Sequence, residues 1–103
     1  MTSDRSKTIE KCRKRYLNEY KYIHKKDDRI TIFEEISEKA AAAGATAWKK
    51  FADGTSAYLK EEHEAALALF DESIALDQEF AYPLNGKGNV FSDQKRYDEA
   101  LVA

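Results

Sequence analysis

The sequence predicts an all-α protein built from antiparallel helical hairpins that stack on one another. Residues from Ala47 onward repeat at an offset of 34, the length of one helix-turn-helix unit. Apolar residues recur at spacings of three and four, which place them on one face of a helix. Only four glycines and one proline occur in 103 residues, so few positions would interrupt a helix.

The repeat is visible when the chain is compared with itself at this offset. No insertion is needed, and four pairs of positions keep the same residue: Ala47 and Ala81, Gly54 and Gly88, Ala66 and Ala100, Leu67 and Leu101. The run Tyr97-Asp98-Glu99-Ala100-Leu101 and the pair Leu76-Asp77 resemble the start and the end of the second helix in the tetratricopeptide repeat (TPR) family. The resemblance implies a short α-solenoid that acts as a protein-binding scaffold.

This comparison divides the chain into three parts. We expect an N-terminal helical hairpin at 1–45, which is a divergent repeat or a cap, a complete TPR-like repeat at 46–80 and a partial one at 81–103. The expected helices lie near 5–26, 29–43, 46–60, 62–77, 82–93 and 96–103. Thr31 and Glu34 have the spacing of a capping box, Asp28 is a competing cap, Thr46 is a plausible N-cap for the third helix, and Gly44 should end the second helix.

Small residues within the repeat indicate where two helices approach closely. We expect Ala66 of one helix to face Gly54 of the other. The residues predicted to pack the repeats are Gly54, Ala66, Phe70, Gly88, Tyr97 and Ala100.

Charge is unevenly distributed along the chain, although the net charge is only −2. Residues 1–30 hold ten Lys/Arg against five Asp/Glu, whereas residues 31–103 hold seven against fourteen. Basic residues beside Tyr16, Tyr20 and Tyr22 would suit nucleic acid, because cations neutralise phosphates and rings stack on bases. We favour the explanation in which the two halves attract each other, and keep a basic-arm nucleic-acid binder as an alternative function.

The sequence shows neither a membrane span nor a secretory signal. The single cysteine, Cys12, cannot form an internal disulfide. We therefore expect a cytoplasmic protein, since that compartment keeps thiols reduced.

No residue pattern predicts catalysis, a metal site or a cofactor. His24 precedes Asp27 and Asp28 where the first helix should end, and His63 has no ligand-type residue at the next helical turn. Asn85-Gly86-Lys87-Gly88-Asn89 lacks the spacing of a phosphate-binding loop. We therefore expect a protein that is not an enzyme.

The TPR resemblance implies that the first helices of successive units line a groove for a peptide or a partner helix. The candidate groove residues are Lys49, Phe51, Thr55, Tyr58, Asn85 and Asn89. One alternative is the N-terminal recognition arm of a larger enzyme or signalling protein. Because repeat stacks need covered ends, we also expect either self-association through the C-terminal face or a longer repeat protein.

Overall fold

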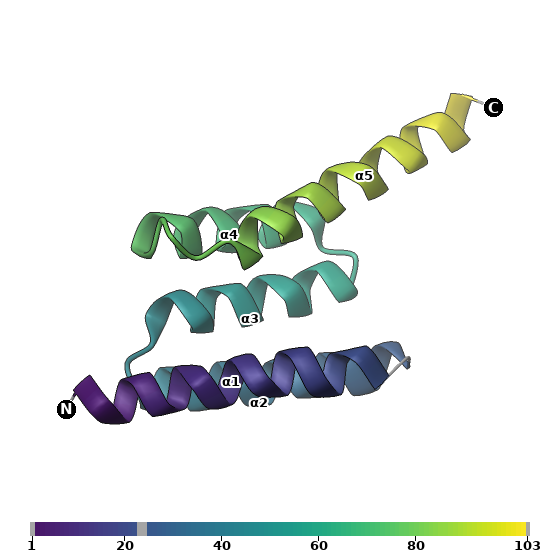
Figure 1. Cartoon of the computed structure of the whole chain (residues 1–103). Coiled ribbons are helices and arrows are strands. Elements are labelled where there is room, and N and C mark those ends of the chain that lie inside the picture. Colours follow the sequence, from purple (N-terminus) through teal and green to yellow (C-terminus); the bar gives the residue numbers. More distant parts are fainter. Residues whose placement is uncertain (1, 23–24, 103) are drawn as a thin grey trace.

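The chain forms a stack of antiparallel helices, as Figure 1 shows. The computed structural model describes the backbone of residues 2–22 and 25–102, and the side chains of residues 6–17 and 25–96. The helices are α1 (Thr2–Tyr22), α2 (Lys26–Ala42), α3 (Thr46–Leu59), α4 (His63–Leu76) and α5 (Tyr82–Val102). The described residues contain no strand, so the predicted all-α class is confirmed.

The last pair of predicted helices is wrong, because α5 runs unbroken where we expected a turn between residues 93 and 96. Between α3 and α4 the chain turns at Glu61, whose φ of 64° is unfavourable for a residue with a side chain. Burial of Ala66, Phe70 and Ser73 on α4 offsets that cost. At the offset of 34, Lys95 corresponds to Glu61, and it too is not a glycine. In the continuous helix the backbone groups of Lys95 are hydrogen-bonded without a left-handed residue.

The predicted start of α2 and the predicted N-cap of α3 are also wrong. Helix α2 begins at Lys26, so Thr31 lies inside it and its hydroxyl donates to the Asp27 carbonyl oxygen at 3.1 Å instead of capping. Asp27 therefore lies in the first turn, where the helix dipole favours a carboxylate. Thr46 is already helical and Ala45 is the N-cap of α3. Gly44, with φ of 73°, follows the end of α2 as predicted.

The core lies where α3 packs between α2 and α4. Phe33 and Ile36 of α2 and Ala66 and Phe70 of α4 are all at most 1% exposed. Phe51 of α3 is the centre of an aromatic cluster, with ring centroids 5.4–6.3 Å from those of six neighbours: Tyr16, Phe33, Trp48, Phe70, Phe80 and Tyr82. This cluster joins all five helices.

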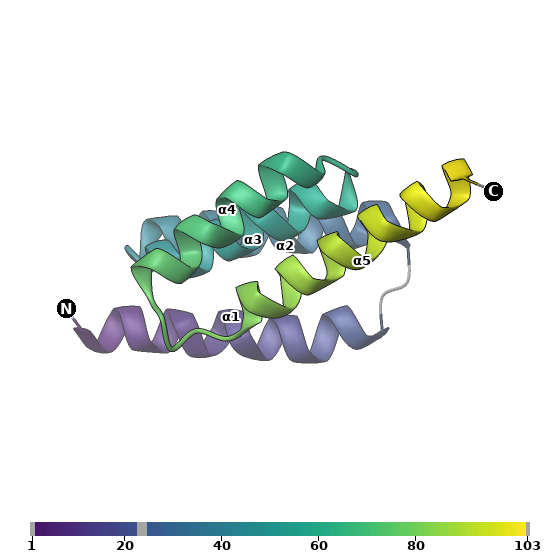
Figure 2. The ribbon, with the colours of Figure 1, turned by 90° about the horizontal axis from the view of Figure 1, so that it is seen from above.

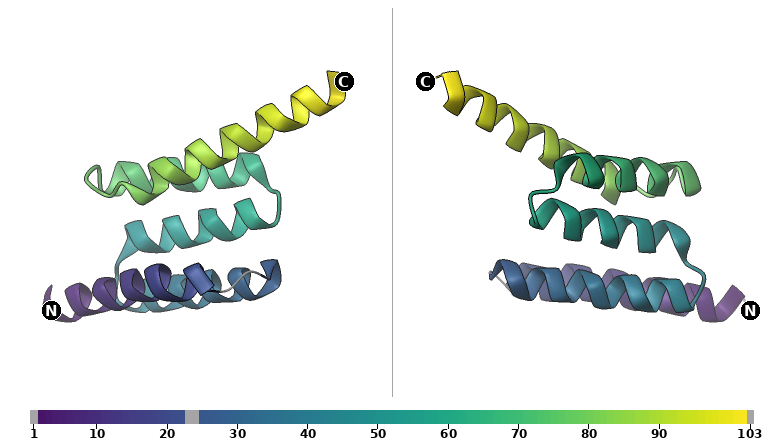
Figure 3. Two further views of the ribbon diagram at one scale, coloured as in Figure 1. Left: turned by 45° about the vertical axis from the view of Figure 1, so that its right-hand side comes forward. Right: turned by 180° about the vertical axis from the view of Figure 1, so that it is seen from behind.

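Helix α1 lies along one side of the molecule, as the view from above shows (Figure 2). Among its described side chains only Cys12 is fully buried. Arg15 forms an ion pair with Glu35 of α2. At the opposite end of the stack, the C-terminal half of α5 extends beyond α4 (Figure 3).

Candidate functional site

Five of the six predicted groove residues line one cavity, of about 40 Å³. Phe51, Thr55 and Tyr58 come from α3, and Asn85 and Asn89 come from α5. The other lining residues are Tyr16 of α1, Phe70 of α4, and Tyr82 and Gly86 of α5. We call the surface formed by these nine residues the groove.

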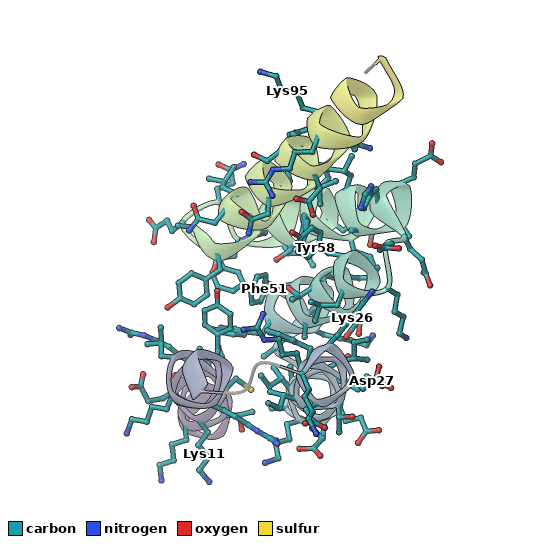
Figure 4. All side chains as sticks on the ribbon, turned by 90° about the vertical axis from the view of Figure 1, so that its right-hand side faces the viewer. Lys11, Lys26, Asp27, Phe51, Tyr58 and Lys95 are labelled. Atoms are coloured by element: carbon teal, nitrogen blue, oxygen red, sulfur yellow. The ribbon has the colours of Figure 1, made fainter. Side chains whose placement is uncertain are left out.

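Five of the nine residues of the groove are aromatic. The rings of Tyr16 and Tyr82 approach to 5.0 Å, so side chains from α1 and α5 meet above Phe51. The Phe51 ring lies 5.6 Å from Tyr16 and 5.8 Å from Tyr82. Phe51 and Tyr58 lie near the middle of the molecule, whereas Lys11 points away from it (Figure 4). Rings from α1, α3 and α5 therefore meet at the groove.

Hydrogen bonds fix two of the polar side chains of the groove. The Tyr58 hydroxyl donates to Oδ2 of Asp93 on α5 at 2.7 Å, and the Thr55 hydroxyl donates to the Phe51 carbonyl oxygen at 2.9 Å. Asp93 was not predicted, because only the fold brings it within reach of a residue 35 positions earlier.

Asn85 and Asn89 stand one helical turn apart on the same side of α5. Both are exposed, and within the described part of the chain neither side-chain amide has a hydrogen-bond partner. Each amide offers two N–H donors and a carbonyl acceptor. These two side chains are therefore free to bind the backbone of another chain.

Lys49 does not join the groove. Its ammonium group binds Oδ2 of Asp53 at 2.6 Å, and Oδ1 of Asp53 accepts a 2.5 Å hydrogen bond from the Ser37 hydroxyl. This network ties α3 to α2.

The predicted packing residues have different outcomes. Ala66 and Phe70 are buried, and a Cβ added at Gly54 would lie only 2.7 Å from Cε1 of Phe70. Gly88, by contrast, is exposed, and a Cβ there would meet nothing within 4 Å. Gly86 has the contact instead, since its added Cβ would lie 2.6 Å from Cζ of Phe70. The side chains of Tyr97 and Ala100 lie outside the described residues.

Three larger hollows surround the N-terminal half of α1. Two of about 370 and 360 Å³ share Ile9, Trp48 and Asp77, and the second also includes Arg13 and Phe80. The third, of about 400 Å³, lies between α1 and α2 and is lined by Thr8, Lys11, Lys39, Ala42 and Ala43. Among the described side chains of α1 one is buried, Cys12, whereas α3 has seven buried residues.

The chemistry of the described side chains is limited. They contain no group of three His, Cys, Asp or Glu residues that could hold a metal ion. The His63 ring stacks on Tyr58 at 6.4 Å, and His24 lies outside the described residues. Among the described helices, none is both long enough and apolar enough to cross a membrane.

Tyr16, which we considered as a base-stacking residue, is used inside the protein. Its ring lies 5.9 Å from Phe33 and also contacts Phe51 and Tyr82. The side chains of Tyr20 and Tyr22 are outside the described part.

Comparison with family models, with characterised proteins and with solved structures gives no match. The TPR resemblance therefore remains a prediction.

Proposed function

We propose that this chain is a non-enzymatic interaction module that binds a peptide or a partner helix in the groove. The observation that carries the proposal is that five residues chosen from the sequence line the same cavity, from two helices. Aromatic side chains give such a surface apolar contact area, and the free amides of Asn85 and Asn89 supply hydrogen bonds that fix a ligand backbone.

The size of the cavity favours a peptide over a small molecule. Pockets for small ligands have volumes of about 300–1,000 Å³, and this cavity has about 40 Å³. It has room for one small side-chain group, while the rest of the ligand lies across the exposed asparagines. An extended peptide with a small apolar residue at its centre suits this shape.

A random peptide library selected on the purified chain provides the test. We expect that selected peptides bind Asn89→Ala about fivefold more weakly, the effect of losing one hydrogen bond of about 1 kcal/mol. Glu38→Ala is the matched control, because this exposed residue lies on α2 away from the groove. Peptides that bind wild type and Asn89→Ala equally would contradict the proposed site, and a library without binders would contradict the function.

Self-association through the C-terminal face is a second proposal. Leu84 and Phe91 on α5 are 54% and 53% exposed, which favours a partner on this face.

A cytoplasmic location is also proposed, supported by the free, buried thiol of Cys12. Nucleic-acid binding has less support, because Tyr16 is engaged in packing; absence of oligonucleotide binding at low salt would remove it.

A further inference from the structure

One face of α5 has no partner among the described residues. Leu84, Gly88, Phe91 and Lys95 follow one another at spacings of four, three and four, so they form a single strip along the helix. All four are exposed. We call these four residues the outer strip; Lys95 extends from it away from the stack (Figure 4).

The equivalent strip on α3 shows what such a face accepts. At the offset of 34, Gly88 corresponds to Gly54, and Phe91 to Ala57. Gly54 is buried against the ring of Phe70, which comes from the antiparallel helix α4, and Ala57 is only 7% exposed. A glycine on this face therefore accepts an aromatic ring from an antiparallel helix.

The outer strip carries both partners of this kind of contact. Gly88 is the open glycine, and Phe91 is an exposed ring three residues away, about 4.5 Å along the axis. Within one chain the ring of Phe91 does not cover Gly88, because no atom lies within 4 Å of where a Cβ would stand. Two copies of α5 can, because an antiparallel arrangement brings each ring to the glycine of the other copy.

We infer that two copies of this chain associate by antiparallel packing of their outer strips. Along α5, the two-fold axis lies at the level between residues 89 and 90, midway between Gly88 and Phe91. Phe91 of each copy then covers Gly88 of the other. Leu84 then lies against the aliphatic part of Lys95 of the second copy, whose ammonium group remains in water. The same patch meets itself, as a closed two-fold dimer requires. This inference rests on the self-association proposed above and gives it a site.

The charges beside the strip are compatible with this contact. The only charged side chain within the strip is Lys95, and the neighbouring Lys87 is already bound to Asp71 of α4 at 2.6 Å. No buried unpaired charge is therefore created. One pair of helices covers less than the roughly 1,200–2,000 Å² of a standard stable interface. We expect a weak dimer that forms in a concentration-dependent way.

Sedimentation equilibrium across a concentration series tests the dimer. The weight-average mass of the wild type should rise from one chain toward two, whereas Phe91→Lys should remain a monomer. Phe91 is exposed in the monomer, so circular dichroism should show the same helix content for Phe91→Lys as for the wild type. Leu76→Lys is the matched control, because Leu76 is 55% exposed on α4 but lies outside the strip, and it should dimerise as the wild type does.

The results of these experiments distinguish a dimer through the outer strip from self-association through another surface. A wild type that is monomeric at all concentrations overturns both. A Phe91→Lys variant that still dimerises overturns the outer strip and leaves self-association standing. An added peptide with the α4 sequence, residues 63–76, provides a further result. If the chain is a monomer that binds this peptide at Phe91, the inference that a second copy occupies this face is wrong.

Cysteine cross-linking tests the direction of the two helices. In a Cys12→Ala background, a mixture of Leu84→Cys and Lys95→Cys chains should form a mixed disulfide dimer. Lys95→Cys alone should not, because its two copies would lie about 16 Å apart along the axes. Efficient cross-linking of Lys95→Cys with itself would contradict the antiparallel arrangement.

Discussion

Phe70 is held between two glycines that belong to different helices. Its ring lies within 3 Å of where a Cβ would stand at Gly54 of α3 and also at Gly86 of α5. Because both sides are occupied, the ring cannot move away from one glycine without meeting the other. The absence of two side chains therefore permits α3, α4 and α5 to meet around a single phenylalanine.

This arrangement predicts opposite effects for two glycine-to-alanine exchanges. Gly54→Ala should destabilise the protein, because an overpacking cost of about 1–3 kcal/mol exceeds the gain of about 1 kcal/mol in helix propensity. Gly88→Ala meets no atom and should increase the free energy of unfolding by up to about 1 kcal/mol. Urea denaturation at low protein concentration, where the chain is a monomer, measures both. A Gly54→Ala variant as stable as Gly88→Ala would contradict the tight contact between Gly54 and the Phe70 ring.

Cys12 links stability to alkaline pH. Burial raises the pKa of its thiol, although Lys39 and Arg15 act in the opposite direction. The folded chain therefore holds this proton more tightly than the unfolded chain does. The resulting stabilisation is complete below the ordinary thiol pKa of about 8.5 and is lost as the pH rises through the raised value.

We therefore expect the free energy of unfolding to fall more steeply above about pH 8.5 in the wild type than in Cys12→Ala. All other ionisable groups are the same in both proteins, so their contribution cancels in the difference between the two curves. Chemical denaturation at a series of pH values provides the measurement. Parallel curves for the two proteins would show that the thiol has no part in the pH dependence.

Among the elements, α3 and α4 could be predicted well and α5 could not. Helical spacing and the repeat offset locate α3 and α4 to within two residues, because these signals are local. Whether the chain turns near Lys95 depends on the burial gained by folding back, which spacing does not report. The same limit applies to α2, because Asp27 and Asp28 were expected to lie between the first two helices and instead lie in the first turn of α2.

Five of the groove residues could be expected on one surface, because local spacing and the repeat offset place them on equivalent faces of two helices. Phe51, Thr55 and Tyr58 recur at helical spacing, and the 34-residue offset transfers that face to Asn85 and Asn89. Lys49 was misplaced because its partner Asp53 is itself held by Ser37, a contact between two helices. Tyr16 and Asp93 were missed because their places in the site depend on how α1 and α5 meet α3.

The contact between α3 and α4 predicts the effect of enlarging Ala66. This residue is 0% exposed, so Ala66→Leu should overpack the helix contact and lower the free energy of unfolding by about 1–3 kcal/mol. Ala68→Leu is the matched control, since Ala68 lies on the exposed side of the same helix. An unchanged denaturation midpoint for Ala66→Leu would show that the two helices do not meet there.

In the molecule as a whole, packing decreases from α3 outward. Helix α3 has seven buried residues, whereas α1 has hollows of about 360–400 Å³ around its N-terminal half. Among the described side chains of α1, Cys12 is buried, Tyr16 joins the aromatic cluster, and Arg15 pairs with Glu35. Since Tyr16 also lines the groove, movement of α1 would displace one of the groove residues.

This gradient predicts the order of amide hydrogen exchange. Segments with few buried contacts open with a lower free energy than the core does, so the amides of α1 should exchange before those of α3 and α4. Removing the ring in Tyr16→Ala should accelerate exchange in α1 and leave α4 unchanged. Leu17→Ala provides the control, because Leu17 is 48% exposed and its loss should leave the exchange order as in the wild type. If the amides of α1 were as protected as those of α3, the hollows would not weaken its attachment, and α1 would form one cooperative unit with the core.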